Sequence, residues 1–203
     1  MDLERLTAIA EKNMKGRRSH RERELGFAFY HGQRVAQGVI ALRKRVTDDE
    51  THDALLRCAA MFHDVGKGFT AHGAAGAELA RYLLKDELTE QEMNEVCRLI
   101  LAHDRRAPGT DEWDLWAKLL QDADLLDHFG TMETWLNFHY CAYEDAPIQE
   151  SVAFYRDEYP AELKKHRAKL NFDVSKAIFD DKAAFTMAFA ERMAVEARGD
   201  YAI

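Results

Sequence analysis

A histidine and an aspartate stand side by side where a mostly apolar run of the sequence ends. The run extends from Leu55 to Phe62, and His63 and Asp64 follow it directly. Burying an imidazole and a carboxylate costs several kcal/mol unless each group finds a partner. A metal ion is such a partner, because neutral imidazoles and carboxylates are standard metal ligands. The pair therefore suggests a metal site whose other ligands come from elsewhere in the chain.

Three further polar residues lie on helix faces that should be apolar. Apolar residues recur at steps of three and four along residues 27–46, and His31 shares their face. His103 shares the corresponding face of residues 96–103, and Asp124 lies on the apolar stripe of the next helix. Each could be a core residue satisfied by hydrogen bonds. Together with the dyad they favour a metal centre.

Helix geometry selects between two neighbouring aspartates. Asp122 and Asp124 are two residues apart, about 200° around a helix of 3.6 residues per turn, so both cannot face one ion. Asp124 is the one on the apolar stripe, and Asp127 lies one turn further. The remaining histidines are expected at helix ends or among polar neighbours rather than as ligands: His20, His52, His128, His139 and His166.

The elements that position these residues are predicted to be helices throughout. Only three prolines occur in 203 residues, and no stretch alternates polar and apolar residues as a strand would. Capping-box sequences start at Thr47 and Thr89. Helices are expected over residues 27–46 and 174–198. Two more follow the capping boxes at 47–50 and 89–92 and end near residues 64 and 103. Another is expected from about 111 to 129, because the chain breaks at 107–110 and Gly130 is a helix stop. The prediction is one all-α domain.

The composition restricts the class of protein. A net charge of −8 argues against a nucleic-acid duplex as partner, because proteins that bind one usually carry a basic surface. No apolar run approaches about 18 residues and Met1 opens no leader pattern, so we expect no membrane span and a cytoplasmic location. The three cysteines, Cys58, Cys97 and Cys141, form no C-x-x-C pair, which fits a reducing compartment.

Three motifs resemble the HD-domain superfamily of metal-dependent phosphohydrolases. They are His31-Gly32-Gln33-Arg34-Val35, Phe62-His63-Asp64-Val65-Gly66-Lys67 and Asp122-Ala123-Asp124-Leu125-Leu126-Asp127. The resemblance implies a single HD-domain helical bundle over residues 25–130 that carries the metal site. An N-terminal helical segment over residues 1–24 would precede it, and a C-terminal helical extension over residues 131–203 would pack on it.

The resemblance also implies a ligand set. The metal would be held by His31, His63, Asp64 and Asp124. Such a set leaves coordination positions open for a phosphate oxygen and for water, which the ion would activate as the nucleophile. Imidazole and carboxylate ligands without thiolate suit divalent Mn, Fe, Co, Ni, Zn or Mg, with one or two ions per chain.

A second ion is a further implication of the resemblance. His72 and His103 are similar to the additional histidine motifs of two-metal HD proteins, in which Asp64 would bridge both ions. The alternative is that His72 caps a helix starting at Gly73, and that His103 hydrogen-bonds in the core or contacts the substrate.

Basic residues near the motifs are candidates for phosphate binding. Lys67 follows the dyad in a glycine-flanked turn, and Arg34 either contacts phosphate or pairs with a carboxylate such as Asp127. Arg105 and its neighbour Arg106 could line the mouth of the site, with a structural salt bridge as the alternative for each arginine. The residues assigned to catalysis are Asp64, Lys67 and Asp127, and those assigned to substrate binding are Lys67, Arg34, His103 and Arg105.

The predicted function is hydrolysis of a phosphoester or phosphoanhydride by metal-activated water. The resemblance implies a nucleotide or another small phosphorylated metabolite as the substrate. Two alternatives stay open: an HD-type di-iron oxygenase that uses six ligands, and a non-catalytic, metal-containing domain for signalling or binding. Exposed aromatic residues in the C-terminal half would permit a homodimer.

Overall fold

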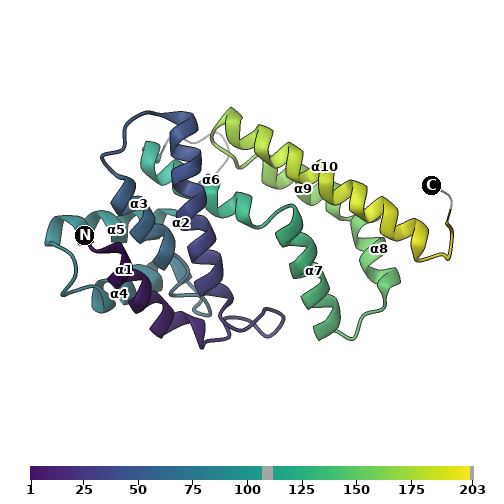
Figure 1. Ribbon diagram of the computed structural model, residues 1–203, viewed down its shortest axis with the longest axis horizontal. Helices are drawn as coiled ribbons and strands as arrows, with labels where there is room; N and C mark the ends of the chain where they lie inside the picture. The colour runs from purple at the N-terminus through teal and green to yellow at the C-terminus, as the bar shows by residue number, and fades with distance from the viewer. Residues whose placement is uncertain (107–111, 202–203) are drawn as a thin grey trace.

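The computed structural model describes residues 1–106 and 112–201, and these residues form helices and connecting turns without a strand (Figure 1). The all-α prediction is confirmed. None of the described helices is long and apolar enough to cross a lipid bilayer. The elements are α1 (Leu3–Ala10), the π-helical turn η1 (Glu11–Lys15), α2 (Phe27–Val46), α3 (Asp53–Phe62), α4 (His72–Leu83), α5 (Glu90–Ala102), α6 (Leu115–Asp127), α7 (Thr131–Tyr143), α8 (Ile148–Asp157), α9 (Tyr159–Arg167) and α10 (Asp173–Glu196).

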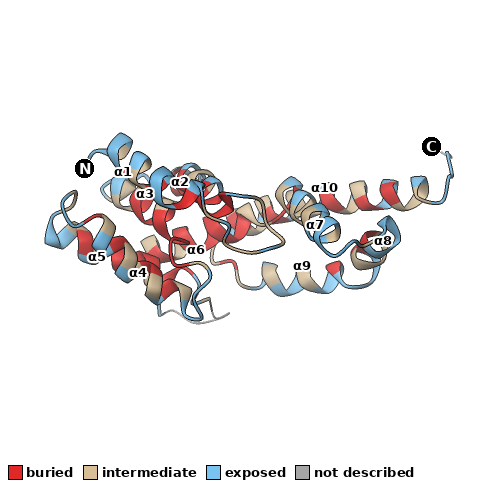
Figure 2. Ribbon diagram, turned by 90° about the horizontal axis from the view of Figure 1, so that it is seen from below, coloured by how far each residue is buried: buried red, intermediate tan, exposed pale blue. Residues whose placement is uncertain are grey.

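Helices α2, α3, α5 and α6 surround the larger hydrophobic core. Helix α2 packs against α3 and α6, and α5 packs against α3, α4 and α6. Val39, Leu56, Val96, Leu99 and Leu120 are fully buried between them, and Figure 2 shows the buried surface concentrated in this part of the molecule. Helices α2 and α6 carry His31 and Asp124, and the other predicted ligands except His72 follow the ends of α3 and α5, so apolar packing fixes where these ligands lie.

Side-chain caps set the beginning of α5 and of α6. Thr89 accepts a hydrogen bond from the N–H of Glu92, whose carboxylate accepts the Thr89 N–H, so the predicted capping box is confirmed. Helix α6 begins at Leu115, where Asp114 caps it. The predicted break at residues 107–110 and the predicted helix start at Asp111 lie outside the described residues.

The predicted capping box at Thr47 is wrong. Helix α3 begins only at Asp53, six residues after Thr47. The Thr47 hydroxyl accepts a hydrogen bond from the Asp49 N–H at 3.2 Å and so closes a local turn. The Arg43 guanidinium donates to the Asp53 carboxylate at 2.8 Å and ties the start of α3 to the end of α2. A tertiary ion pair therefore sets the helix start instead of the local sequence.

The end of α6 and helices α8, α9 and α10 form a second, smaller core. Tyr155, Tyr159 and Phe179 are its largest buried side chains. Helix α10 contacts α7, α8 and α9 and also reaches α6 and α2. In Figure 1 it runs along one side of the C-terminal helices, from the larger core toward the C-terminus. The closing helix predicted over residues 174–198 is present at Asp173–Glu196.

Asp122 links the two cores. Its fully buried carboxylate accepts hydrogen bonds from the backbone N–H of Asn171 at 2.9 Å and of Phe172 at 3.1 Å. The Asn171 side chain donates a further bond at 2.8 Å. Burial raises the pKa of Asp122, while these bonds oppose the rise. Asp122 thus holds the start of α10 against α6, on the side that helix geometry separates from Asp124.

Candidate metal centre

Two clusters of histidine and aspartate side chains meet inside the larger core. In the first, the Nε2 atom of His31 lies 2.9 Å from Oδ1 of Asp124 and 3.2 Å from Nε2 of His63. The Nε2 atom of His63 lies 3.4 Å from the same Asp124 oxygen and 3.9 Å from Oδ1 of Asp64. All four residues are buried. Helices α2, α3 and α6 therefore bring together the four residues that the sequence indicates for a first metal ion.

Asp64 also faces a second cluster. Its Oδ1 atom lies 3.8 Å from Nε2 of His72 and 3.7 Å from Nε2 of His103, and these two nitrogens are 3.2 Å apart. Helix α4 begins at His72, with Ala71 as N-cap and no side-chain capping bond. The alternative in which His72 caps a helix starting at Gly73 is therefore wrong. Asp64 is shared by both clusters.

Backbone hydrogen bonds determine which ring nitrogens face the clusters. The Nδ1 atom of His63 donates to the Ala60 carbonyl at 2.7 Å, and that of His103 donates to the Ile100 carbonyl at 2.6 Å. In a neutral imidazole the other nitrogen, Nε2, then carries a lone pair. Lone pairs and carboxylate oxygens that converge at these distances repel one another unless a cation lies among them.

A buried carboxylate oxygen without a partner adds to this argument. Among the described residues, no group donates a hydrogen bond to Oδ2 of Asp64, although that atom is buried. Burying such an oxygen unpaired costs about 1–3 kcal/mol or more. A divalent ion that accepts nitrogen and oxygen ligands would satisfy both this oxygen and the converging imidazoles. The residues present therefore fit a metal ion.

Charge pairs surround His31 and Asp124 in the first cluster. Burial lowers the pKa of His31, but its hydrogen bonds with Asp124 and Asp127 outweigh burial and raise that pKa to about 9. Burial raises the pKa of Asp124, yet the charges of Arg106 and His63 hold it well below its usual range. A metal that binds His31 therefore has to displace a proton.

Asp127 contacts His31 on the side away from the first cluster. Its Oδ2 atom accepts the Nδ1–H of His31 at 2.7 Å. Arg34 donates to the same carboxylate, from Nη2 at 2.9 Å and from Nε at 3.0 Å. Arg34 was expected either to contact phosphate or to pair with a carboxylate, and the structure shows it paired with Asp127. The arrangement suits Asp127 to orient the His31 ring rather than to transfer a proton.

The Asp127→Asn variant is expected to lower metal affinity roughly 10- to 100-fold, because an amide orients and polarises the His31 ring less well than a carboxylate does. Titration against a chromophoric chelator measures the effect. The exposed Asp181→Asn variant is the control for loss of one negative charge. Metal affinity equal to that of the unmodified protein would show that Asp127 does not orient a ligand.

The predicted phosphate-binding residues differ in their distance from the clusters. The Lys67 amino group lies 3.3 Å from Oδ1 of Asp64. Arg106 forms an ion pair with Asp124 and donates to a backbone carbonyl of α6 at 3.2 Å. Arg105 is exposed, and within the described part of the chain its side chain forms no ion pair with either cluster. The structure therefore brings Arg106 to the site in place of Arg105.

His128 belongs to the site, although the sequence analysis set it aside. Its Nε2 atom lies 3.4 Å from Oδ1 of Asp124, and its ring centroid is 4.6 Å from that of His31. Burial lowers the pKa of His128. The signal in the sequence was the four-residue spacing from Asp124, which places two side chains on one helix face. Its position close to the expected helix end at residue 129 obscured that relation.

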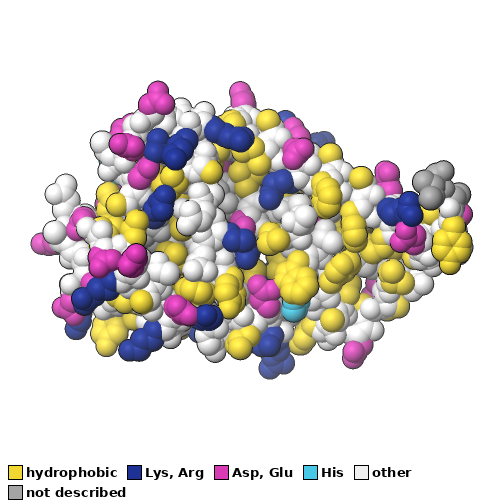
Figure 3. Space-filling model, in the orientation of Figure 1, with side chains coloured by type: hydrophobic (Ala, Val, Ile, Leu, Met, Phe, Trp, Pro, Cys, Tyr) yellow, Lys and Arg dark blue, Asp and Glu magenta, His cyan; other side chains and the backbone are white. Residues whose placement is uncertain are grey.

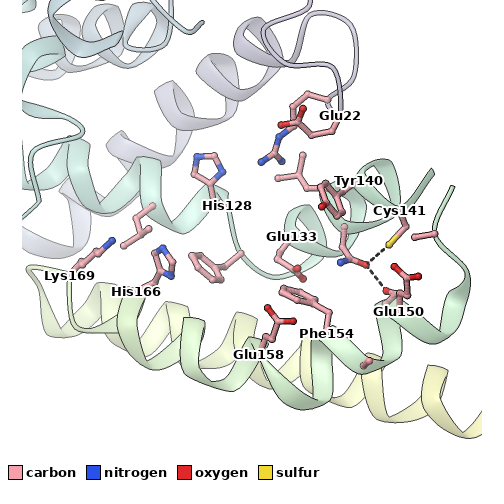
Figure 4. Close-up of a pocket in the computed structure, with 18 of the residues that line it drawn as sticks. Glu22, His128, Glu133, Tyr140, Cys141, Glu150, Phe154, Glu158, His166 and Lys169 are labelled. Carbon is pink, nitrogen blue, oxygen red and sulfur yellow. Dashed lines mark hydrogen bonds between the residues drawn. The ribbon is translucent and has the colours of Figure 1, made fainter. Parts of the chain in front are cut away.

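A pocket of about 930 Å³ opens beside the clusters. Its wall includes Arg106 and His128, which also contact Asp124, so the pocket adjoins the first cluster. Figure 4 shows His128, His166 and Lys169 toward one end of this pocket and Glu133, Glu150 and Glu158 toward the other. Arg106 and Lys169 make one side of the pocket basic and the glutamates make the other acidic, while burial lowers the pKa of His128 and of His166.

The environment of Glu133 predicts that the free energy of unfolding depends on pH. Burial raises the pKa of Glu133 from 4.5 to about 7, so the folded state loses stability as pH rises through this interval and the carboxyl group ionises. The Glu133→Gln variant should therefore gain stability over the unmodified protein between pH 4.5 and 7, by about 1–3 kcal/mol after allowance for partial exposure. Urea unfolding at both pH values measures this, with Glu144→Gln as the charge control. A difference that does not change with pH would contradict the prediction.

The face of the molecule in Figure 3 shows hydrophobic side chains gathered over α7 and α10. Trp135, Phe138, Tyr140 and Phe185 are more than two-fifths exposed, at 51%, 42%, 52% and 56%. A homodimer through such aromatic side chains stays a prediction.

Comparison with known proteins places this site in a family. Residues 28–128 match the model of the HD domain, and this span holds the described residues of both clusters. The chain belongs to the HD-domain superfamily. A comparison with curated proteins finds no match.

Several solved structures share the fold over nearly the whole chain. An HD-superfamily hydrolase from Bacillus thuringiensis has a TM-score of 0.68 at 20% identity, covering 97% of this chain and 96% of that one. A predicted HD superfamily hydrolase from an uncultured Thermotogales bacterium has a TM-score of 0.59 at 20% identity, covering 96% and 92%. Bacillus subtilis YpgQ in complex with ADP has a TM-score of 0.65 at 14% identity, covering 96% and 97%.

Proposed function

We propose that this protein is a metal-dependent phosphohydrolase that cleaves a phosphoester or phosphoanhydride bond of a nucleotide or another small phosphorylated metabolite. The observation that carries the proposal is the pair of buried clusters that share Asp64 and adjoin a pocket with a basic wall. The structurally similar HD-superfamily hydrolases support hydrolysis as the class of reaction.

We infer that the ligands would divide between two ions. His31, His63, Asp64 and Asp124 would hold one, and Asp64, His72 and His103 would hold the other. A bound divalent ion lowers the pKa of its water toward about 7 and neutralises charge on a phosphoryl group. Mn, Fe, Co, Ni, Zn and Mg all accept nitrogen and oxygen ligands, and metal analysis of the purified protein identifies the ion.

Side chains of this protein supply the remaining functions. Lys67 and Arg106 bring positive charge to Asp64 and Asp124, where the phosphate oxygens of a bound substrate would lie. Asp127 orients His31 through its Nδ1–H. These groups are partly buried, which limits the screening of their charges by water and would strengthen their interaction with an anionic substrate.

A nucleotide fits the pocket in size and charge. Pockets for small molecules typically enclose about 300–1,000 Å³, and this one has about 930 Å³. Arg106, His128 and Lys169 offer cationic or hydrogen-bonding groups toward an anion. The ADP bound in the structurally similar YpgQ supports the same substrate class.

Metal analysis joined to a substrate screen tests the proposal. The purified protein should contain close to two divalent ions per chain, and it should release phosphate or pyrophosphate from at least one nucleotide or sugar phosphate when supplied with Mn, Co, Ni, Fe or Mg. A His63→Ala variant that keeps its helical circular dichroism should lose this activity. Retention of the activity in that variant would overturn the proposal.

A di-iron oxygenase is the second candidate, because six ligands are assembled in two clusters that share one carboxylate: His31, His63, Asp64, His72, His103 and Asp124. Iron-loaded protein that consumes dioxygen in the presence of a small organic substrate, without phosphate release, would favour it. The basic wall of the pocket favours a phosphorylated substrate instead.

A further inference from the structure

A carboxyl group faces the pocket at a distance from the metal clusters. Glu133, in the first turn of α7, lines the pocket and is partly buried. Its Oε2 atom accepts the Tyr155 hydroxyl at 3.0 Å. Within the described residues, no other group donates to this carboxylate, and no cation pairs with it. One of its oxygens is therefore free to accept a hydrogen bond from a ligand.

A hydrogen-bond donor lies one helical turn further along α7. The Oδ1 atom of Asn137 accepts the Ser151 hydroxyl at 2.5 Å and the Cys141 thiol at 3.7 Å. Two donors on this oxygen fix the orientation of the amide, so its Nδ2–H₂ group is the side available to the pocket. No described residue accepts a hydrogen bond from that group. Asn137 also lines the pocket.

Glu133 and Asn137 are neighbours on one face of α7, because residues four apart lie one above the other. They present an acceptor beside a donor. An amino group next to an unprotonated ring nitrogen is complementary to this pair, whereas a ring carbonyl next to an N–H offers the reverse order. The pair therefore discriminates between the edges of heteroaromatic rings.

Aromatic side chains surround this pair. Tyr140 and Phe154 line the same pocket, and Figure 4 shows them on either side of Glu133. Flat aromatic walls suit a planar ring, because stacking is favourable with any ring that has a π face. Lys169, a cation, and His128, a hydrogen-bonding group, lie at the other end of the pocket, where an anionic group would be held.

We propose that α7 selects phosphorylated substrates with an amino-substituted heteroaromatic ring, such as adenine or cytosine nucleotides, through Glu133 as acceptor and Asn137 as donor. The ring would lie between Tyr140 and Phe154, with its phosphates directed toward the metal clusters. This inference rests on the proposed function for the placement of the phosphates. It goes further in assigning the two residues that read the ring. Burial raises the pKa of Glu133 to about 7, so the carboxylate, in which both oxygens accept hydrogen bonds, prevails above that pH.

Two pairs of nucleotides with opposite hydrogen-bonding edges, adenine with hypoxanthine and cytosine with uracil, test the inference. Binding of the α,β-methylene analogues of ADP, IDP, CDP and UDP to the metal-loaded protein is measured by calorimetry. The adenine and cytosine analogues should bind about tenfold or more tightly than the hypoxanthine and uracil analogues, because a reversed edge leaves Glu133 and Asn137 unpaired. The Glu133→Gln variant should lose or invert both ratios, since its amide accepts from Tyr155 and turns a donor toward the pocket. Glu144→Gln, an exposed site at the end of α7, should keep them.

The Asn137→Asp variant provides a second measurement, because it replaces the donor with an acceptor of the same shape. It should also lower the preference for adenine and cytosine. Equal affinities within both pairs, ratios that survive in Glu133→Gln, or no binding of any of the four analogues would overturn the inference. A preserved preference in a protein that releases no phosphate would overturn the proposed hydrolysis and leave this inference standing.

Discussion

Replacing Asp64 by asparagine is expected to lower turnover more than about a hundredfold and to reduce the bound metal below its full amount. The Oδ1 atom of Asp64 lies 3.7 to 3.9 Å from the Nε2 atoms of three imidazoles that belong to two clusters. An amide has nearly the same shape, but it offers one neutral oxygen and two N–H donors. It therefore cannot connect two cations. Steady-state kinetics and elemental analysis of the same sample measure the two effects.

Asp122→Asn is the matched control for this substitution, because Asp122 is also fully buried but contacts neither cluster. It should keep its metal content and its turnover per folded molecule while losing thermal stability. If Asp64→Asn keeps its full metal content and rate, Asp64 does not join the two clusters. If both variants lose metal together, the loss reflects unfolding rather than ligation.

Removing the metal is expected to lower the midpoint of thermal unfolding by roughly 5–10 °C. A ligand present at a hundred times its dissociation constant stabilises the folded state by about 2.7 kcal/mol, and about 2–4 °C corresponds to each kcal/mol in a chain of this size. The physical reason is the convergence of imidazole lone pairs and carboxylates in one buried volume. Calorimetry of the purified protein before and after dialysis against a chelator measures the shift.

Readdition of the ion should restore the midpoint. The Asp64→Asn variant serves as the control, and the chelator should change its melting temperature much less. Equal midpoints for the untreated and chelated protein, with metal content shown to differ, would mean that the clusters do not use the ion for stability.

Helical periodicity was sufficient to place three of the site residues on inner helix faces, whereas their grouping into a ligand set came from the resemblance to HD domains. His31, His103 and Asp124 each interrupt an apolar stripe, and a stripe specifies which side chains enter the core. The same geometry separated Asp122 from Asp124, and the structure gives Asp122 a different function at the start of α10. Both inferences need only the number of residues per helical turn and the assumption that the helices surround one core.

Other features depend on contacts that a single stretch of sequence does not define. The Arg43–Asp53 pair moved the start of α3 away from Thr47. His128 is the C-cap residue of α6, and its contact with Asp124 depends on how the last turn of that helix closes. Glu133 faces a pocket only because α8 packs beside α7. The sequences of two amphipathic helices do not specify that they pack against each other.

The bonds of Asp122 have a consequence for the minimal functional unit of the chain. Removing the helices after residue 130 would take away Asn171 and Phe172 and open the Asp122 carboxylate to water. The hydrogen bonds that tie α6 to the start of α10 would be lost with them. A shortened chain would therefore hold α6, and with it Asp124, less firmly.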